Sequence, residues 1–127
     1  MNAEFPRSDA PAAALDEASL ARLRELDPDG VHGVVNRVLA AYETSLNRLL
    51  GQLRSETCAG DPAQVAGIAH TLKSSSASVG ALALAASCAD IERRRRGGAA
   101  DDLPVDVQRL LDEGDAALRA VAAVLRP

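Results

Sequence analysis

The chain has 127 residues and a net charge of −4, with 47% hydrophobic and 25% charged residues, which fits one folded domain rather than a disordered tail. The net negative charge and the presence of only two aromatic residues, Phe5 and Tyr42, argue against binding to a nucleic-acid backbone or stacking on bases. No apolar run approaches the roughly 20 residues that cross a bilayer, and the first residues lack a secretory signal, so we expect a cytoplasmic protein without membrane insertion.

The composition favours helices. The chain contains 26 Ala and 17 Leu residues, both strong helix formers, while β-branched and aromatic residues are too scattered to build a sheet. The two cysteines, Cys58 and Cys88, form no CxxC pair and lie far in sequence from the two histidines. We therefore expect an all-α protein with reduced thiols and no metal site.

The first part of the chain divides at residue 14. Residues 1–14 are rich in Ala and Pro and carry no apolar period, so they are interpreted as a flexible lead-in or linker, and residues 15–127 as the domain. Leucines at positions 15, 20, 23 and 26 fall near one stripe and predict a short first helix. The sequence Asp27-Pro28-Asp29-Gly30 predicts its end.

The next two helices have clearer signals. Apolar residues recur at spacings of three and four from Val31 to about Arg54 and predict a long amphipathic helix, followed by a polar segment at 55–60. Asp61 then offers an N-cap acceptor and Pro62 suits the first helical position, so a third helix begins there. Gly80 is the residue expected to end it.

The last two helices complete a bundle. A fourth helix is predicted from Ala81 to Arg96, with Gly97 and Gly98 as a break, and a fifth after Pro104, with Gly114 as a weak point. Four long amphipathic helices joined by short breaks bury their apolar stripes by packing on one another. The sequence therefore predicts an antiparallel four-helix bundle with a short additional N-terminal helix.

One residue of the third helix does not belong to the core. His70 is two positions from both Ile68 and Leu72, about 160° around the helix from each, so it faces outward. Its same-face neighbours are all small, and they are Ala63, Ala66, Ser74 and Ala77. Another protein's active site could therefore approach the imidazole closely, with Ala66 and Ala77 in the docking face.

Lys73 follows His70 by three positions, which places its ammonium on the same face. A neutral imidazole is a competent nucleophile near neutral pH, and a phosphoryl group attached to it would be partly neutralised by that lysine. The sequence contains no phosphate-binding glycine loop, so the phosphoryl group must come from another protein. The second histidine, His32, has no such lysine or small neighbours and is interpreted as structural.

The segment AHTLKSSSASVGA at residues 69–81, followed by Leu84, Cys88 and Ile91-Glu92, resembles the signature of histidine-containing phosphotransfer (HPt) domains of phosphorelays. The likeness covers about residues 15–98, and the last helix matches only in type. The resemblance implies a monomeric helical bundle that carries phosphate on His70, accepting it from a receiver-domain aspartate and passing it to another receiver. It implies no cofactor on this chain, because Mg²⁺ belongs to the partner receiver.

The resemblance also implies roles for further residues. Lys73 takes the position that balances the phosphate charge, Glu92 a position that can hydrogen-bond the imidazole, and Arg96 a position that is basic in some members. Ser74 departs from the usual glycine and could narrow the approach of a partner or donate a hydrogen bond to the phosphate. Such a domain is a carrier and not an enzyme with turnover of its own.

Several alternatives stay open. The run Arg93 to Arg96 is interpreted as a solvated helix end, or else as a surface that steers an acidic partner. A scaffold or dimerisation bundle in which His70 is incidental, and the phosphate-accepting domain of a chemotaxis-type kinase charged from ATP, both fit the composition. The domain could be free-standing or the C-terminal part of a hybrid sensor histidine kinase, and the identity of the receivers and the direction of phosphate flow are not encoded.

Overall fold

The structure, a computed structural model, describes residues 14–98 and 102–127. Within those ranges the chain forms only helices, as the composition predicts. They are α1 (Glu17–Arg24), α2 (Val34–Leu53), α3 (Glu56–Ala59), α4 (Pro62–Val79), α5 (Leu82–Arg96) and α6 (Leu103–Leu125).

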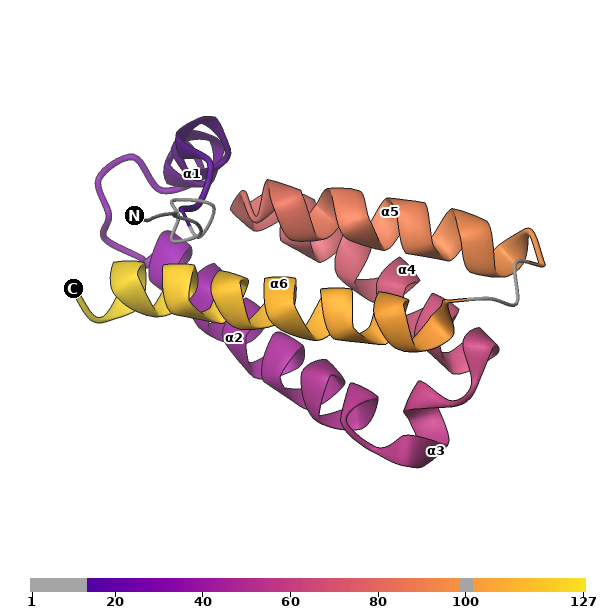
Figure 1. Cartoon of the computed structure of the whole chain (residues 1–127). Helices are drawn as coiled ribbons and strands as arrows, with labels where there is room; N and C mark the ends of the chain where they lie inside the picture. The colour runs from indigo at the N-terminus through magenta and orange to yellow at the C-terminus, as the bar shows by residue number, and fades with distance from the viewer. Residues whose placement is uncertain (1–13, 99–101) are drawn as a thin grey trace, which may run out of the picture.

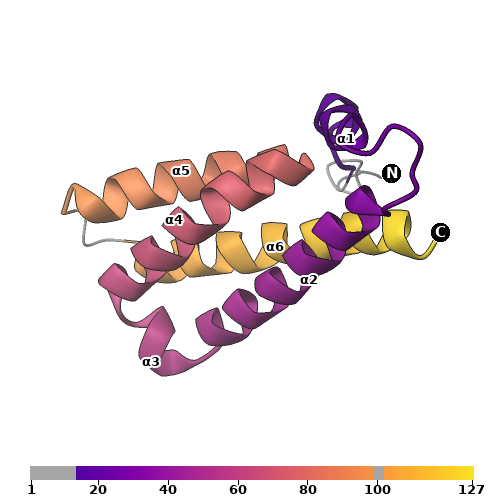
Figure 2. The same cartoon turned by 180° about the vertical axis from the view of Figure 1, so that it is seen from behind.

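The four long helices α2, α4, α5 and α6 form the predicted antiparallel bundle, with successive helices running in alternating directions (Figure 1). Each packs against two neighbours, α2 against α4 and α6, and α5 against α4 and α6. Seen from behind, α4 lies between α5 and α2 (Figure 2). The short helix α1 lies across one end, where it contacts α2 and α4, so the expected additional N-terminal helix is confirmed.

The core is built from the predicted apolar stripes. Its largest fully buried side chains come from all four long helices and include Leu39, Leu46, Leu50, Leu53, Leu72, Leu84, Ile91 and Leu110. Gly114, predicted to be a weak point of the last helix, is buried against α2, and a Cβ atom there would lie 2.6 Å from Leu50 Cδ2. The glycine therefore permits a close approach of α6 to α2.

Helix α4 begins and ends where the sequence predicts. The Asp61 carboxylate accepts hydrogen bonds from the backbone N–H groups of Ala63 and Gln64, and the Gln64 side chain donates back to it at 3.0 Å, which satisfies free donors of the first turn. At the other end Gly80 has φ of 89° and accepts a hydrogen bond from Asp16 N–H at 2.9 Å. A Cβ on Gly80 would lie 2.7 Å from that nitrogen, so the glycine both ends α4 and lets α1 dock on the turn.

The segment between α1 and α2 departs from the prediction. Leu26 and Val31 are exposed rather than part of the buried stripes, because α1 already ends at Arg24 and α2 begins only at Val34. Gly33 adopts a left-handed conformation that starts α2, and the buried Asp27 carboxylate accepts hydrogen bonds from the N–H groups of His32 and Val34. Asp27 thus caps the start of α2 although it lies well before the N-cap position, which is where sequence rules look for a capping residue.

The polar segment at 55–60 contains a helix that the sequence did not predict. Ser55 accepts a hydrogen bond from Cys58 N–H at 3.2 Å and caps the single turn of α3. That turn buries Cys58 between α2 and α4. Four residues are too few to show a hydrophobic period, so the spacing of apolar residues does not predict α3.

Two expectations concern residues that the structure does not describe. The lead-in at 1–14 lies outside the described residues except for Ala14, and its interpretation stays a prediction. The break at Gly97-Gly98 does end α5, and residues 99–101 after it are not described. None of the helices in the described ranges is both long enough and apolar enough to cross a membrane.

Candidate functional site

His70 lies in the middle of α4, and its side chain is 59% exposed. Ile68 and Leu72, two residues away on either side, are buried in the core. The outward orientation predicted from the helical angle is therefore confirmed. The burial of Ile68 and Leu72 fixes the rotation of α4 about its axis, and this rotation exposes the imidazole to solvent.

The neighbouring helix α5 supplies the partner of the imidazole. Glu92 is a nearly buried carboxylate with 6% of its side chain exposed, and its Oε2 lies 2.8 Å from His70 Nδ1. An ionised carboxylate can only accept a hydrogen bond, so Nδ1 carries the hydrogen, and in the neutral form of the ring Nε2 is the nitrogen with the lone pair. Within the described ranges no side chain hydrogen-bonds Nε2. In the neutral ring the pairing therefore leaves the lone pair on the outer nitrogen, Nε2.

The same carboxylate holds two cations. Lys73 Nζ donates to Glu92 Oε1 at 2.8 Å, and Arg96 lies 3.0 Å from Oε2. The hydrogen bond from Lys73 lowers the pKa of Glu92, burial opposes this, and the hydrogen bond from His70 and the charge of Arg96 lower it further. Glu92 is therefore an anion under ordinary conditions. We call His70, Lys73, Glu92 and Arg96 the Glu92 cluster.

The structure brings these four residues together. Lys73, expected to reach a group attached to the imidazole, is bound to Glu92, and Arg96, expected as a secondary contact of the imidazole or the phosphate, lies on the same carboxylate. Helical spacing places Lys73 on the same face as His70, but it cannot show which acceptor on another helix the ammonium selects. The phosphate-related roles of these residues stay predictions.

The small-residue face around His70 is only partly as predicted. Ala63, Ser74 and Ala77 are exposed, so the surface along α4 is free of bulky side chains at these positions. Ala66, expected in the docking face, is buried. Because α4 packs against α5 on one side and α2 and α3 on another, its buried stripe is wider than one row and includes position 66. The exposed Gly67 is the small residue that lies open instead.

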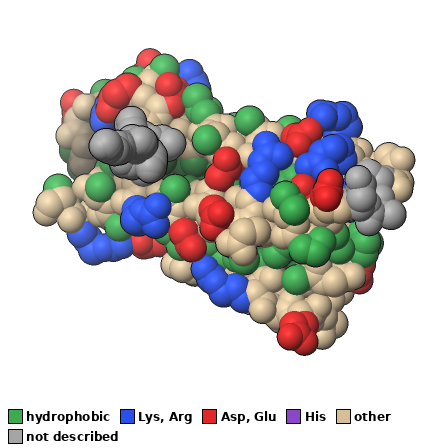
Figure 3. All heavy atoms as spheres, viewed as in Figure 1, with side chains coloured by type: hydrophobic (Ala, Val, Ile, Leu, Met, Phe, Trp, Pro, Cys, Tyr) green, Lys and Arg blue, Asp and Glu red, His purple; other side chains and the backbone are tan. Residues whose placement is uncertain are grey.

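The arginine run at the end of α5 is only partly a solvated helix end, because Arg93 and Arg96 are exposed while Arg95 is buried. The Arg95 side chain is fully buried and lies 3.1 Å from Asp106 of α6, and Arg94 makes two hydrogen bonds to the same buried carboxylate. Arg93 and Arg94 also pair with Asp90. Figure 3 shows charged side chains of both signs gathered over this end of α5 and α6. Arg94 and Arg95 therefore hold α5 to α6, and only Arg96 of the run belongs to the cluster around Glu92.

Other candidate groups do not form a second reactive site. His32 lies exposed in the loop before α2, and both cysteines are free and buried. Burial raises the pKa of Cys88 to about 12, so its thiol stays protonated and unreactive. In the part of the chain that the structure describes, no group of three or more His, Cys, Asp or Glu side chains could hold a metal ion.

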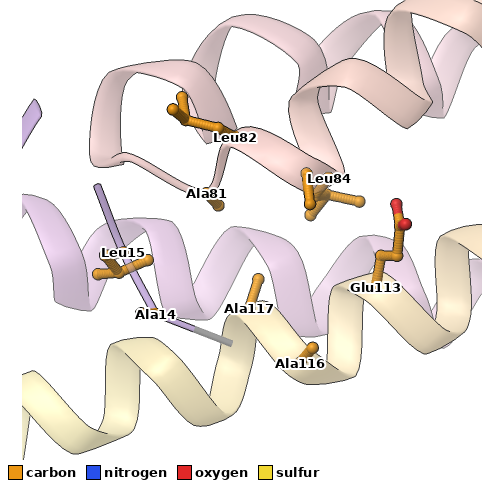
Figure 4. Close-up of a pocket in the computed structure, with 9 residues that line it drawn as sticks. Ala14, Leu15, Ala81, Leu82, Leu84, Glu113, Ala116 and Ala117 are labelled. Carbon is orange, nitrogen blue, oxygen red and sulfur yellow. The ribbon is translucent and has the colours of Figure 1, made fainter. Parts of the chain in front are cut away.

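A small apolar pocket lies at the end of the bundle that carries α1. Figure 4 shows it between Leu15, the start of α5 and the α6 residues Glu113 and Ala117. Its volume is about 70 Å³, far smaller than a typical ligand site. None of the residues of the Glu92 cluster lines it. His70 therefore lies on an exposed face of α4, away from this pocket.

Comparison with known proteins identifies the family. The Hpt domain model matches residues 37–123, which include α4, α5 and nearly all of α2 and α6. The chain therefore belongs to the Hpt domain family. A crystal structure of histidine-containing phosphotransfer protein B (HptB) from Pseudomonas aeruginosa PAO1 is similar in fold, with a TM-score of 0.75 and 24% sequence identity over 91% of this chain and 97% of that chain. The curated proteins gave no match.

Proposed function

We propose that this protein carries a phosphoryl group on Nε2 of His70, accepting it from an aspartyl phosphate of one receiver domain and passing it to the aspartate of another. An Hpt domain is a phosphotransfer carrier of a phosphorelay, and the chain belongs to that family. The observation that supports His70 as the carrier residue is its exposed imidazole with Nδ1 hydrogen-bonded to Glu92.

The geometry suits a reversible transfer. Nε2 of His70 attacks the phosphorus, the N–P bond forms, and the P–O bond to the donor carboxylate breaks, so the donor leaves as an ionised carboxylate. No proton has to move, because the ring hydrogen stays on Nδ1, where it is held by Glu92. Because the Nε2 lone pair now bonds phosphorus while Nδ1 keeps its hydrogen, the ring gains a positive charge in the phosphorylated state, which makes it a good leaving group for the reverse attack by a second aspartate.

The receiver is proposed to supply what this chain lacks. A divalent cation, Mg²⁺, and most of the groups that stabilise the transferring phosphoryl would come from the partner. This chain contributes the nucleophile and an open helix face with Ser74 and Ala77 beside it. We propose that it works in the cytoplasm as a monomer. Both a free-standing carrier and the C-terminal domain of a hybrid sensor histidine kinase fit this role.

The test is transfer of label from a phosphorylated receiver domain. The protein is incubated with a ³²P-charged receiver and Mg²⁺, and three forms are compared: the natural sequence, His70→Gln and His32→Gln. We expect an acid-labile, base-stable adduct in the natural sequence and in His32→Gln, and none in His70→Gln. The His32 variant is the matched control because it removes the other histidine of the chain.

The alternatives give different results. A scaffold in which His70 is incidental takes no label from any donor and binds its partner equally well after His70→Gln. The phosphate-accepting domain of a chemotaxis-type kinase takes label from an ATP-charged kinase domain and not from receivers. Label on a residue other than His70 would contradict the proposal in either case.

A further inference from the structure

The Glu92 cluster contains more cationic side chains than carboxylates. Glu92 is paired with Lys73 on Oε1 and with Arg96 on Oε2, while His70 Nδ1 donates to Oε2. Two basic side chains therefore face one carboxylate, so that, with the ring in the neutral form that attacks phosphorus, the cluster holds one positive charge in excess before any phosphoryl group arrives. An ion pair that served only to hold α4 to α5 would need a single cation.

The two cations differ in what they can reach. Lys73 is on α4, three residues after His70, so the flexible stem of the same-face lysine can bring its ammonium to a group on the outer ring nitrogen. Arg96 is on α5, one turn after Glu92, in the position of an i,i+4 partner of that carboxylate. The Lys73 ammonium can therefore move from Glu92 to a phosphoryl group on His70, while Arg96 remains paired with Glu92.

We propose that, when His70 is phosphorylated, the Lys73 ammonium moves from Glu92 to the phosphoryl group. Arg96 is then the positioning residue that keeps Glu92 paired with a cation. This inference rests on the proposed function. Glu92 is almost fully buried, and a buried carboxylate left without its cation would be strongly unfavourable. With Arg96 on Oε2, Lys73 can move without leaving the carboxylate unpaired.

The charges balance in the phosphorylated state. A phosphoryl group with two negative charges, on a ring that keeps its Nδ1 hydrogen and one positive charge, adds one net negative charge to the cluster. That charge cancels the excess positive charge present beforehand. Glu92 stays bound to the Nδ1 hydrogen and to Arg96, and Lys73 neutralises the phosphoryl oxygens. Arg96 therefore acts through Glu92 and not by touching the phosphate.

The sequence offers an unusually direct test, because Lys73 is the only lysine in the chain. Protein grown with ¹³C,¹⁵N-lysine gives the Lys73 side-chain signals alone in an NMR spectrum. We expect these signals to differ between the natural sequence and Glu92→Gln before phosphorylation, and to shift when His70 is phosphorylated by a charged receiver. Phosphorylated Glu92→Gln should give Lys73 signals close to those of the phosphorylated natural sequence, because the lysine is then bound to the phosphoryl group in both.

The role of Arg96 is tested by rate. We expect Arg96→Ala to slow phosphorylation of His70 by about two- to fivefold, the size of an exposed ion-pair effect, since the Arg96 side chain is 61% exposed. Arg96→Lys should recover most of the rate, and the deficit of Arg96→Ala should shrink at high salt. The matched control is Arg93→Ala, which removes an exposed arginine of the same run that pairs with Asp90 instead and should leave the rate unchanged.

The outcomes separate this inference from the proposed function. If His70 takes no label, the proposed function is wrong. If His70 takes label but the Lys73 signals do not shift, the proposed movement of Lys73 is wrong and the carrier function stands. The same holds for the proposed role of Arg96 if Arg96→Ala behaves as Arg93→Ala does. An equal loss of rate in Arg96→Ala and Arg96→Lys would also overturn it, because the proposal requires the charge at this position.

Discussion

The close approach of α6 to α2 predicts opposite effects for the same substitution at two glycines. A Cβ at Gly114 would lie 2.6 and 2.8 Å from the two Cδ atoms of Leu50, while a Cβ at Gly51 has nothing within 4 Å. Because ordinary carbon contacts are about 3.5–4.0 Å, Leu50 must move by about 1 Å. Leu50 is completely buried, so it has no solvent to move into.

The magnitudes follow from helix propensity and packing. Alanine is favoured over glycine in a helix interior by about 1 kcal/mol, and this is the whole expected effect at Gly51. Overpacking a core costs about 1–3 kcal/mol, so Gly114→Ala should destabilise the protein by about 0–2 kcal/mol after the propensity gain. The two variants should therefore differ in the free energy of unfolding by about 1–3 kcal/mol.

Urea unfolding followed by far-UV circular dichroism measures this difference. Equal m-values would show that the variants expose similar surface on unfolding, so that the midpoints report stability. In a Leu50→Ala background the clash is gone, and Gly114→Ala should then stabilise the protein as Gly51→Ala does. Equal stability of Gly114→Ala and Gly51→Ala in the natural background would refute the tight α2–α6 contact.

Three further predictions concern charged and titratable groups. Burial raises the pKa of Tyr42, the only tyrosine, to about 12, so the stability from its neutral form is lost as pH rises from 10 to 12. The tyrosinate absorbance of the folded protein should titrate with a midpoint near 12, and a midpoint near 10 would contradict the burial. Asp106→Ala should destabilise the protein by about 3–5 kcal/mol in urea unfolding because it removes the buried carboxylate that pairs with both Arg94 and the buried Arg95 side chain, and a loss below about 1 kcal/mol, as for an exposed pair, would refute this. Hydrogen bonds from Arg109 and then from Arg94 lower the pKa of Asp90 from 3.8 to about 2, so its stabilisation is present above pH 3.8 and is lost as pH falls toward 2. Asp90→Asn should therefore flatten that part of the stability profile, and an unchanged profile would argue against the pairing.

Local signals predicted the elements that position the site. The cap at Asp61, the proline after it and the glycine at 80 bound α4 correctly, because each acts on the backbone within a few residues. The outward orientation of His70 followed from its angle to Ile68 and Leu72 alone. The exposed Leu26 and Val31 were predicted wrongly, since apolar spacing continues between Arg24, where α1 ends, and Val34, where the left-handed Gly33 and the Asp27 carboxylate set the start of α2.

Contacts between helices could not be predicted in the same way. The buried pair of Arg95 and Asp106 joins residues on either side of the segment 97–102, and a run of four arginines gives no sign of which one turns inward. The binding of Lys73 to Glu92 is similar, because the lysine has a same-face neighbour in sequence but its acceptor is on another helix. Side-chain pairing across a bundle depends on the relative rotation of two helices, which hydrophobic periodicity fixes only to within the width of a stripe.

The nitrogen that carries the phosphoryl group tests the account most directly. Glu92 occupies Nδ1 of His70, so the account places the phosphoryl group on Nε2. Protein with ¹⁵N-labelled histidine is phosphorylated by a charged receiver, and the ring nitrogens are assigned by NMR from their coupling to ³¹P. Coupling to Nε2 of His70, with the hydrogen retained on Nδ1, is the predicted result, whereas a phosphoryl group on Nδ1, on His32 or on no histidine would contradict it.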